Sequence, residues 1–196
     1  MHPEIISLCL FMFVTSCSPG PNNIVASYSG FNFGVLKTIP HMCGVIFGFT
    51  TLVTIMNFGL VNVFQKYPII QEILKYTGTL FLIYLAYKIS FSKTSSDSEK
   101  KNPVKFIETF FFQFINPKSV IVSVIMVSTY VDRSNDFLFY SFWVIGVAFL
   151  FAIISINFWT LVGKFLRRFA TNEKFIKRFN YVMSLLLLAC IATFYL

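Results

Sequence analysis

Long apolar stretches without charge dominate this chain, and short polar segments separate them. Residues 5–36, 38–65, 137–163 and 179–196 contain no Asp, Glu, Lys or Arg. Several of these stretches exceed the ~20 residues that an α-helix needs to cross a bilayer. The pattern therefore predicts an all-α integral membrane protein with little room for a soluble domain.

The apolar runs predict six transmembrane helices in a single transmembrane domain, residues 1–196. The polar segment 92–103 lies near the middle of the chain and divides it into halves of three spans each, about 1–91 and 104–196. Because three is odd, the second half starts on the opposite side of the membrane from the first. If both halves have the same fold, they therefore form an inverted repeat. The predicted spans are 5–27, 38–62, 69–90, 107–128, 137–162 and 179–196.

Lysine and arginine are distributed unequally between the two sides of these spans. Three connections, those between spans one and two, three and four, and five and six, share one side and hold most of the 16 Lys and Arg residues. By the positive-inside rule that side is cytoplasmic. The linker 92–103 therefore lies inside, and both termini lie outside. The basic residues on the cytoplasmic side are Lys37, Lys88, Lys93, Lys100, Lys101, Lys105, Lys164, Arg167, Arg168, Lys174, Lys177 and Arg178.

The composition agrees with a membrane protein and excludes several other classes. The chain is 56% hydrophobic and 12% charged, with 26 Phe residues and a mean hydropathy of +0.72. The net charge of +8 comes from clusters in short loops, which indicates orientation signals rather than a nucleic-acid surface. The four cysteines lie in apolar runs without metal-binding spacing, so the sequence predicts no metal site, no cofactor and no disulfide.

Residues that break helices interrupt the first predicted span of each half. Pro19-Gly20-Pro21-Asn22-Asn23 lies within the first span, and Asn116-Pro117-Lys118 lies within the fourth. A proline inside a helix frees the carbonyl four residues earlier, and a freed carbonyl in lipid needs a partner from protein or cavity water. Paired interruptions at corresponding positions point to the binding site of a secondary transporter.

The two breaks offer the groups that a small amino acid requires. Freed carbonyls can accept hydrogen bonds from an ammonium group, and the helix that restarts at Asn22 offers N–H groups and partial positive charge to a carboxylate. Lys118 adds a full positive charge. The alternative is that the prolines only kink the helices, that Gln113 only bonds a neighbouring helix, and that Lys118 extends to the membrane surface. The predicted substrate-binding residues are Pro19, Gly20, Pro21, Asn22, Asn23, Gln113, Asn116, Pro117 and Lys118.

Other residues in the spans have two interpretations each. His41 is a candidate proton carrier because imidazole titrates near neutral pH, but a histidine at the cytoplasmic interface is the preferred interpretation. Glu108 is either a second proton site or a carboxylate at the level of the headgroups. Gly44 and Gly48 form a GxxxG pattern, which predicts close packing against a neighbouring helix.

Four motifs resemble those of the LysE/RhtB amino-acid exporters. Their order and spacing agree with that family, and the resemblance covers nearly the whole chain. They are SPGPNNIVASYSGFNFG, IPHMCGVIFG, YTGTLFLIYLAYKI and FFQFINPKSV. The resemblance implies a six-span carrier of the bacterial inner membrane that exports amino acids, driven by protons, and it looks closest to the cysteine/O-acetylserine efflux branch. Phe49 departs from the pattern, since many members carry an acidic residue there. Carried over by position, the functional residues are Pro19, Gly20, Pro21, Asn22, Asn116, Pro117 and Lys118.

The resulting hypothesis is a secondary exporter of small neutral amino acids or their derivatives that works by proton antiport. Its partners are the substrate, protons and the lipid bilayer, and the oligomeric state is left open. The alternative is a passive channel or a structural membrane module, although a channel needs rings of polar residues along a pore. The sequence contains neither GxSxG nor HExxH, so an enzyme is not predicted.

Overall fold

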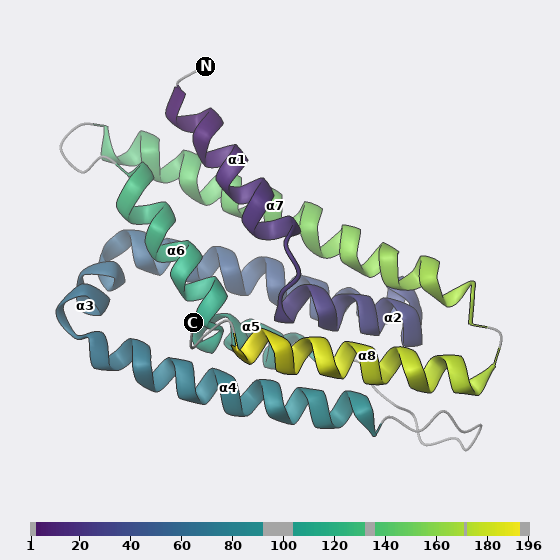
Figure 1. The fold of residues 1–196 in the computed structure, drawn as a ribbon. Coiled ribbons are helices and arrows are strands. Elements are labelled where there is room, and N and C mark those ends of the chain that lie inside the picture. Colours follow the sequence, from purple (N-terminus) through teal and green to yellow (C-terminus); the bar gives the residue numbers. More distant parts are fainter. Residues whose placement is uncertain (1–2, 92–103, 132–135, 171, 193–196) are drawn as a thin grey trace.

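The computed structural model describes residues 3–91, 104–131, 136–170 and 172–192. Over these ranges the chain forms helices and no strand, which confirms the prediction of an all-helical protein (Figure 1). The polar linker 92–103 lies outside the described residues. The helices are α1 (Pro3–Cys17), α2 (Pro21–Ile55), the π-helix η1 (Met56–Leu60), α3 (Val61–Lys66), α4 (Pro68–Ser90), α5 (Phe106–Ile115), α6 (Pro117–Tyr130), α7 (Phe137–Arg167) and α8 (Glu173–Ala192).

Several helices are long and apolar enough to cross a membrane. Among the described residues four helices meet this test by length and composition, or five if the bent pair α5 and α6 counts as one span. The helical run Pro21–Phe64 enters this count once, and the shorter apolar helix Ile5–Cys17 does not enter it. Large apolar side chains such as Leu36, Leu138 and Phe142 are 73–82% exposed on the outer surface, as expected for residues that face lipid. The chain is a multi-pass membrane protein.

Helix α2 reverses direction at Gly34, where the backbone has φ 76° and ψ 172°. Glycine adopts a positive φ without steric cost, so one residue suffices for the reversal. In Figure 1 the purple start and the blue end of α2 run alongside each other, and Pro21 and Val45 border one cavity. The apolar pattern predicts a connection between residues 27 and 38. The structure corrects this: both arms are helical and only Gly34 departs from helical geometry.

The last two helices differ from their predicted limits because charged residues extend them. Helix α7 continues to Arg167, five residues beyond the predicted end, and Lys164 and Arg167 lie in its last turn. Helix α8 begins at Glu173 rather than at residue 179. Basic side chains are favourable at a helix C-terminus and can extend toward water from a membrane helix. The uncharged stretches therefore predicted both helices too short.

Both predicted helix breaks are present. Helix α1 ends at Cys17, and α2 restarts at Pro21 with Gly20 as its N-cap. Helices α5 and α6 meet at Asn116 with a bend of 61°. The side chain of Asn116 accepts a hydrogen bond from the backbone N–H of Lys118 and so caps α6. In each case proline occupies the first turn of the restarted helix, where its missing N–H costs nothing.

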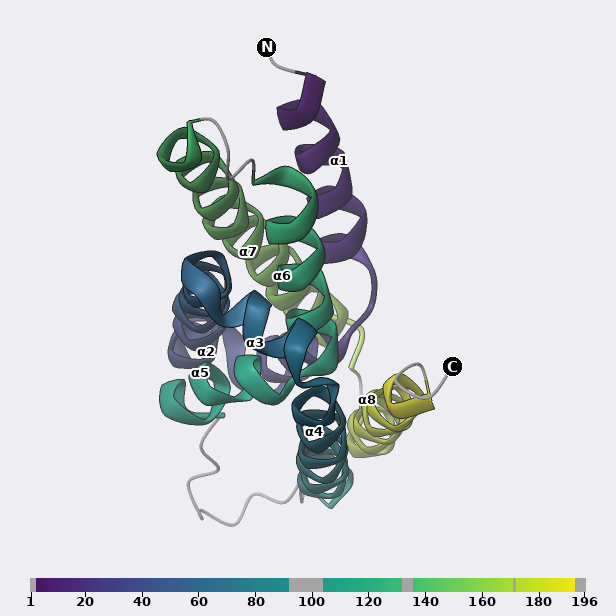
Figure 2. The same cartoon turned by 90° about the vertical axis from the view of Figure 1, so that its left-hand side faces the viewer.

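Glycines allow three helices to pack closely around the two breaks. A Cβ on Gly44 would lie 2.6 Å from the carbonyl oxygen of Phe106, and a Cβ on Gly48 would lie 2.7 Å from that of Phe110. The predicted GxxxG packing face is therefore confirmed, and its partner is α5. The first arm of α2 packs in the same way against α7, where Gly163 lies directly against the carbonyl of Ser27. Figure 2 shows α5 beside α2 in a second view.

Candidate substrate site at the two helix breaks

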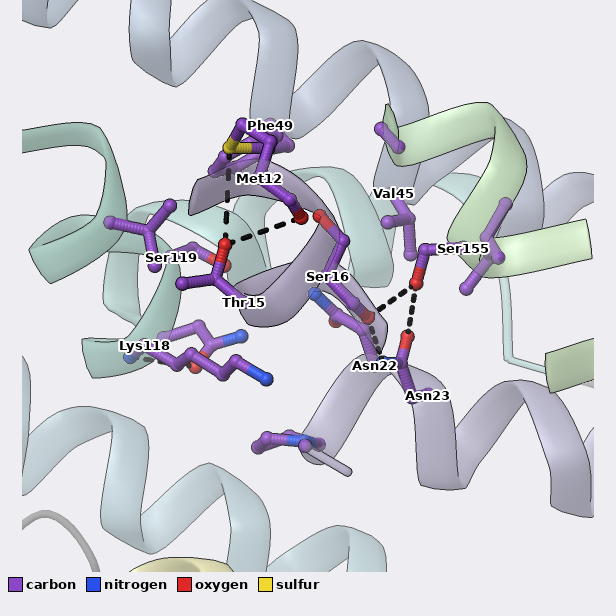
Figure 3. Close-up of a pocket in the computed structure, with 16 residues that line it drawn as sticks. Met12, Thr15, Ser16, Asn22, Asn23, Val45, Phe49, Lys118, Ser119 and Ser155 are labelled. Atoms are coloured by element: carbon purple, nitrogen blue, oxygen red, sulfur yellow. Dashed lines mark hydrogen bonds between the residues drawn. The ribbon is translucent and has the colours of Figure 1, made fainter. Parts of the chain in front are cut away.

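A cavity of about 70 Å³ lies where the two broken helices meet. On the same measure one buried water needs ~10–15 Å³, so the space exceeds that of a single water. Figure 3 shows the residues that border it, which come from α1, α2, α6 and α7 and from the two breaks. They are Met12, Thr15, Ser16, Gly20, Pro21, Asn22, Asn23, Val45, Phe49, Asn116, Lys118, Ser119, Val122, Ala152, Ser155 and Ile156.

Side chains satisfy the backbone carbonyls at the first break. The amide of Asn23 donates to the carbonyls of Ser16 at 2.8 Å and Ser18 at 3.0 Å. The hydroxyl of Ser155 also donates to Ser16, at 2.7 Å, and that of Ser18 donates to the carbonyl of Thr15 at 2.8 Å. The expectation of loose carbonyls is therefore wrong for these groups, because nearby hydroxyl and amide groups already bond them.

Lys118 connects the second break to the first. Its ammonium donates to the hydroxyl of Ser18 at 2.8 Å and to the Ser18 carbonyl at 3.1 Å. Lysine has three N–H donors, so these two bonds leave one donor. The interpretation that Lys118 extends to the membrane surface is wrong, because the side chain points to the α1–α2 break inside the bundle.

Gly20 leaves the space that this ammonium occupies. A Cβ at Gly20 would lie 2.9 Å from the Lys118 Nζ and 3.0 Å from its Cδ. The backbone of Gly20 is extended, with φ −164° and ψ 172°, a conformation open to any residue. Glycine thus matters here for space rather than for its backbone freedom, since a Cβ would displace the flexible side chain of Lys118.

A pair of amides joins the two broken helices beside the lysine. Asn22 Nδ2 donates to Gln113 Oε1 at 2.8 Å, and Gln113 Nε2 donates to Asn22 Oδ1 at 3.1 Å. The hydroxyl of Ser119 adds a third bond to Gln113 Oε1 at 3.0 Å, and Gln113 also donates to the carbonyl of Thr109. Gln113 is fully buried and bonds across helices rather than bordering the cavity. A buried network with each of these groups bonded holds a fixed geometry.

The polar side of the cavity offers both donors and acceptors. The hydroxyls of Thr15, Ser119 and Ser155 each donate to a protein acceptor, at 2.8, 3.0 and 2.7 Å respectively. Their oxygens therefore keep lone pairs for a donor such as an ammonium group. The N-termini of α2 and α6 contribute partial positive charge beside Lys118. One region can thus bind an anion while the neighbouring hydroxyls accept from a cation.

The structure places some predicted residues away from the cavity. His41 is buried between α2 and α5, with its Nδ1 3.0 Å from Thr109 Oγ1 and no hydrogen-bond partner at Nε2. Glu108 caps the first turn of α5 through the backbone N–H of Lys105 at 3.1 Å. Pro19 and Pro117 shape the two breaks but do not border the cavity. The residues that do border it from the predicted set are Gly20, Pro21, Asn22, Asn23, Asn116 and Lys118.

Sequence reasoning missed the hydroxyl residues and the apolar residues of the cavity. Thr15, Ser16 and Ser155 are polar residues within long apolar runs, a signal that was available but weak. Small hydroxyl side chains in membrane helices often bond their own backbone, so their presence alone does not indicate a site. Met12 carried no signal, because apolar residues are common throughout the chain, and Phe49 stood out only as a departure from the family's pattern.

The arrangement defines a class of protein. Long apolar helices surround a cavity that lies between two interrupted helices and is bordered by both apolar and polar side chains, among them a partly buried lysine, which is the architecture of a membrane transporter. Residues 13–195 match the model of the LysE type translocator, and the chain therefore belongs to this family. It is a transporter and not an enzyme. Among the described residues no group of His, Cys, Asp and Glu could hold a metal ion.

Curated relatives agree with this family over almost their whole length. The chain is 29% identical to the cysteine/O-acetylserine efflux protein of Escherichia coli (strain K12), with 97% of each chain covered. The proteins of the same name from Shigella sonnei (strain Ss046) and Escherichia coli O139:H28 show the same identity and coverage. No solved structure matches the chain.

Proposed function

We propose that this protein exports small neutral amino acids or their derivatives from the cytoplasm. The observation that carries the proposal is the meeting of Lys118 with the N-termini of α2 and α6 at one cavity. A carboxylate binds to the remaining N–H of Lys118 and to the partial positive charge of the two helix ends. The ammonium group binds the hydroxyl oxygens of Thr15, Ser119 and Ser155.

Cysteine and O-acetylserine are the first substrates to test. The curated relatives are named for the efflux of these two compounds. Both are neutral α-amino acids with small side chains, which agrees with a cavity of about 70 Å³. A homoserine- or threonine-like compound is the next candidate, since its hydroxyl can bond to the same polar groups.

Six spans in two inverted halves remain our proposal for the architecture. In this arrangement α1 with the first arm of α2 is span one, the second arm of α2 is span two, and α5 with α6 is span four. Two close contacts support it: the first arm of α2 packs on α7 at Gly163, and α5 packs on the second arm at Gly44 and Gly48. Each contact joins one half of a broken helix to a long helix of the other half. We also propose that the membrane is the bacterial inner membrane and that both termini face outward.

Proton antiport is the proposed driving mechanism, and His41 is its first candidate carrier. His41 is buried near the amide pair of Asn22 and Gln113, because Thr109 bonds both His41 and Gln113. If His41 carries the proton, His41→Gln abolishes acceleration by a pH gradient while substrate counterflow continues. Glu108→Gln serves as the comparison, since this side chain caps a helix and lies away from the cavity. Equal acceleration in His41→Gln and the wild type would exclude His41.

The test of export uses purified protein in proteoliposomes and labelled amino acids. Uptake or counterflow of cysteine, O-acetylserine or another small neutral amino acid, saturating with concentration, is the expected result. A failure to transport every amino acid tested, with and without a pH gradient, would overturn the proposal. Flux that rises linearly without saturation would instead favour the passive channel.

A further inference from the structure

Part of the cavity's border is apolar and carries no charged group, although the hydroxyl of Thr15 lies beside it, 4.0 Å from the sulfur of Met12. Met12 of α1 and Val45 and Phe49 of α2 form this wall, and they are only 1%, 6% and 8% exposed. Figure 3 shows Met12 and Phe49 together on one side of the cavity, with Lys118 and Asn22 elsewhere on its border. Neither Met12, Val45 nor Phe49 offers a hydrogen bond strong enough to hold a substrate by itself. The wall can therefore select by shape and polarity alone.

The position of the charged groups determines where a substrate side chain must lie. In an α-amino acid the carboxylate, the ammonium and the side chain leave one tetrahedral carbon in different directions. With the first two groups bound at Lys118 and the hydroxyls, the side chain has the apolar wall left to contact. A charged side chain placed there would lose its hydration without gaining a partner, because Lys118 is the one charged residue that borders the cavity among the described residues.

We propose that Phe49 is a specificity-determining residue whose ring limits the length of the substrate side chain and excludes charged ones. This inference rests on the proposed export of amino acids and adds the side-chain class: short, uncharged and polarisable. A thiol fits this wall because sulfur makes favourable contacts with aromatic rings, and a short ester fits it because it carries no charge. Removing the ring enlarges the cavity on the side where the substrate side chain lies.

A substitution on α7 can reduce the volume of the same cavity. Ala152 borders the same cavity with a single methyl group and is 6% exposed. Leucine at this position fills space that the wild type leaves open. Phe49→Ala and Ala152→Leu therefore change the available volume in opposite directions, and they lie on different helices. Opposite changes in substrate profile distinguish a size limit from a general loss of structure.

The experiment compares initial rates of counterflow for alanine, cysteine, O-acetylserine, leucine, phenylalanine, lysine and glutamate in proteoliposomes. Phe49→Ala is expected to raise the rate for leucine and phenylalanine relative to alanine about tenfold or more, since one methylene group in an apolar pocket already changes a rate about tenfold. Ala152→Leu is expected to lower the rate for O-acetylserine relative to alanine. Lysine and glutamate remain excluded in both. The matched control is Phe47→Ala, which removes a ring from the same helix at a position 51% exposed on the outer surface.

The outcomes separate this inference from the proposed function. Wild-type protein that transports none of these amino acids overturns the proposed function, and the inference with it. Transport by the wild type with an unchanged order of substrates in both Phe49→Ala and Ala152→Leu overturns the inference alone. If Phe49→Ala does not fold, Phe49→Leu gives the smaller enlargement, and an unchanged order in it and in Ala152→Leu has the same meaning.

Discussion

Lys118 carries the one charge that borders the cavity in the described part of the chain, and its partners decide how it acts. The Ser18 carbonyl that it contacts belongs to the C-terminal end of α1, where the partial charge of the helix is negative. The hydroxyl of Ser18 accepts from the lysine and donates onward to the carbonyl of Thr15. A desolvated ammonium is thereby stabilised without a carboxylate, and one N–H donor is left for a substrate.

Replacing Lys118 by methionine keeps the length of the side chain and removes its charge. We expect Lys118→Met to lower transport about 10- to 100-fold, since a hydrogen bond to a charged group contributes ~1.5–3 kcal/mol. Counterflow of labelled cysteine in proteoliposomes measures the loss. Lys88→Met, at an exposed site on α4, is the control. Normal transport by Lys118→Met would remove this residue from substrate binding.

Gly20→Ala tests whether the space beside the ammonium matters. The added Cβ would approach the Lys118 Nζ to 2.9 Å, so the flexible lysine must move away from Ser18. The extended backbone accepts alanine, and we therefore expect a folded protein whose half-saturating substrate concentration is several-fold higher. Gly146→Ala is the matched control, because a Cβ there meets nothing within 4 Å. The same affinity in Gly20→Ala and the wild type would contradict this role.

The sequence predicts the backbone part of the site better than its side-chain part. Prolines and asparagines in an apolar run have one physical consequence, a broken helix, so Pro21 and Asn116 were correctly placed at breaks. A hydroxyl such as that of Ser155 has several possible partners. Its contact with Ser16 depends on how α7 is rotated and how closely it approaches α1, and neither property follows from local sequence.

Single glycines determine how the helices fit together. Gly34 reverses α2, and Gly48 and Gly163 let other helices approach to backbone contact. The GxxxG spacing predicted the contact of Gly48 because that pattern places both glycines on one face of a helix. The predicted spans imply a reversal between residues 27 and 38, but not that Gly34 alone makes it, since an isolated glycine in an apolar run is also compatible with a continuous helix.

Filling the space at Gly48 tests the contact between α2 and α5. A Cβ there would lie 2.7 Å from the Phe110 carbonyl and 2.8 Å from Cγ of Gln113, and the backbone cannot yield as a side chain can. We expect Gly48→Ala to destabilise the protein by ~1–3 kcal/mol, the usual cost of overpacking. A lower unfolding temperature in detergent is the measurement. A stability equal to that of Gly146→Ala would show that α5 does not approach α2 this closely.

At the scale of the whole molecule, several exposed basic residues lie where α7 ends and α8 begins. Lys164, Arg167, Lys174 and Arg178 are all exposed, and the Arg167 guanidinium lies 5.4 Å from the ring centre of Phe31, which is close to the Gly34 reversal in sequence. The charges thus lie beside the same reversal that ends the first arm of α2. This distribution supports a cytoplasmic location for that end of the bundle.

Reporter fusions test the orientation directly. A reporter that is active only in the cytoplasm is expected to be silent after Leu196 and active when inserted in the linker 92–103. An alkaline phosphatase fusion at the same positions is expected to give the opposite pattern, which controls for expression. Activity of the cytoplasmic reporter at the C-terminus would reverse the proposed orientation or change the number of spans.

The contact between Lys118 and Ser18 also bears on the return of the empty carrier. In a carrier whose lysine has no partner when the substrate leaves, an unpaired ammonium must move through an apolar bundle as the empty carrier returns. Such a carrier favours the exchange of one substrate for another. Here Ser18 accepts two hydrogen bonds from the ammonium, so Lys118 is not left without partners when no substrate is bound, although its positive charge remains. We therefore expect net efflux into a substrate-free solution to proceed at a rate close to that of exchange, and Ser18→Ala to slow net efflux more than exchange. Such a protein empties a cell of its substrate rather than trading one molecule for another.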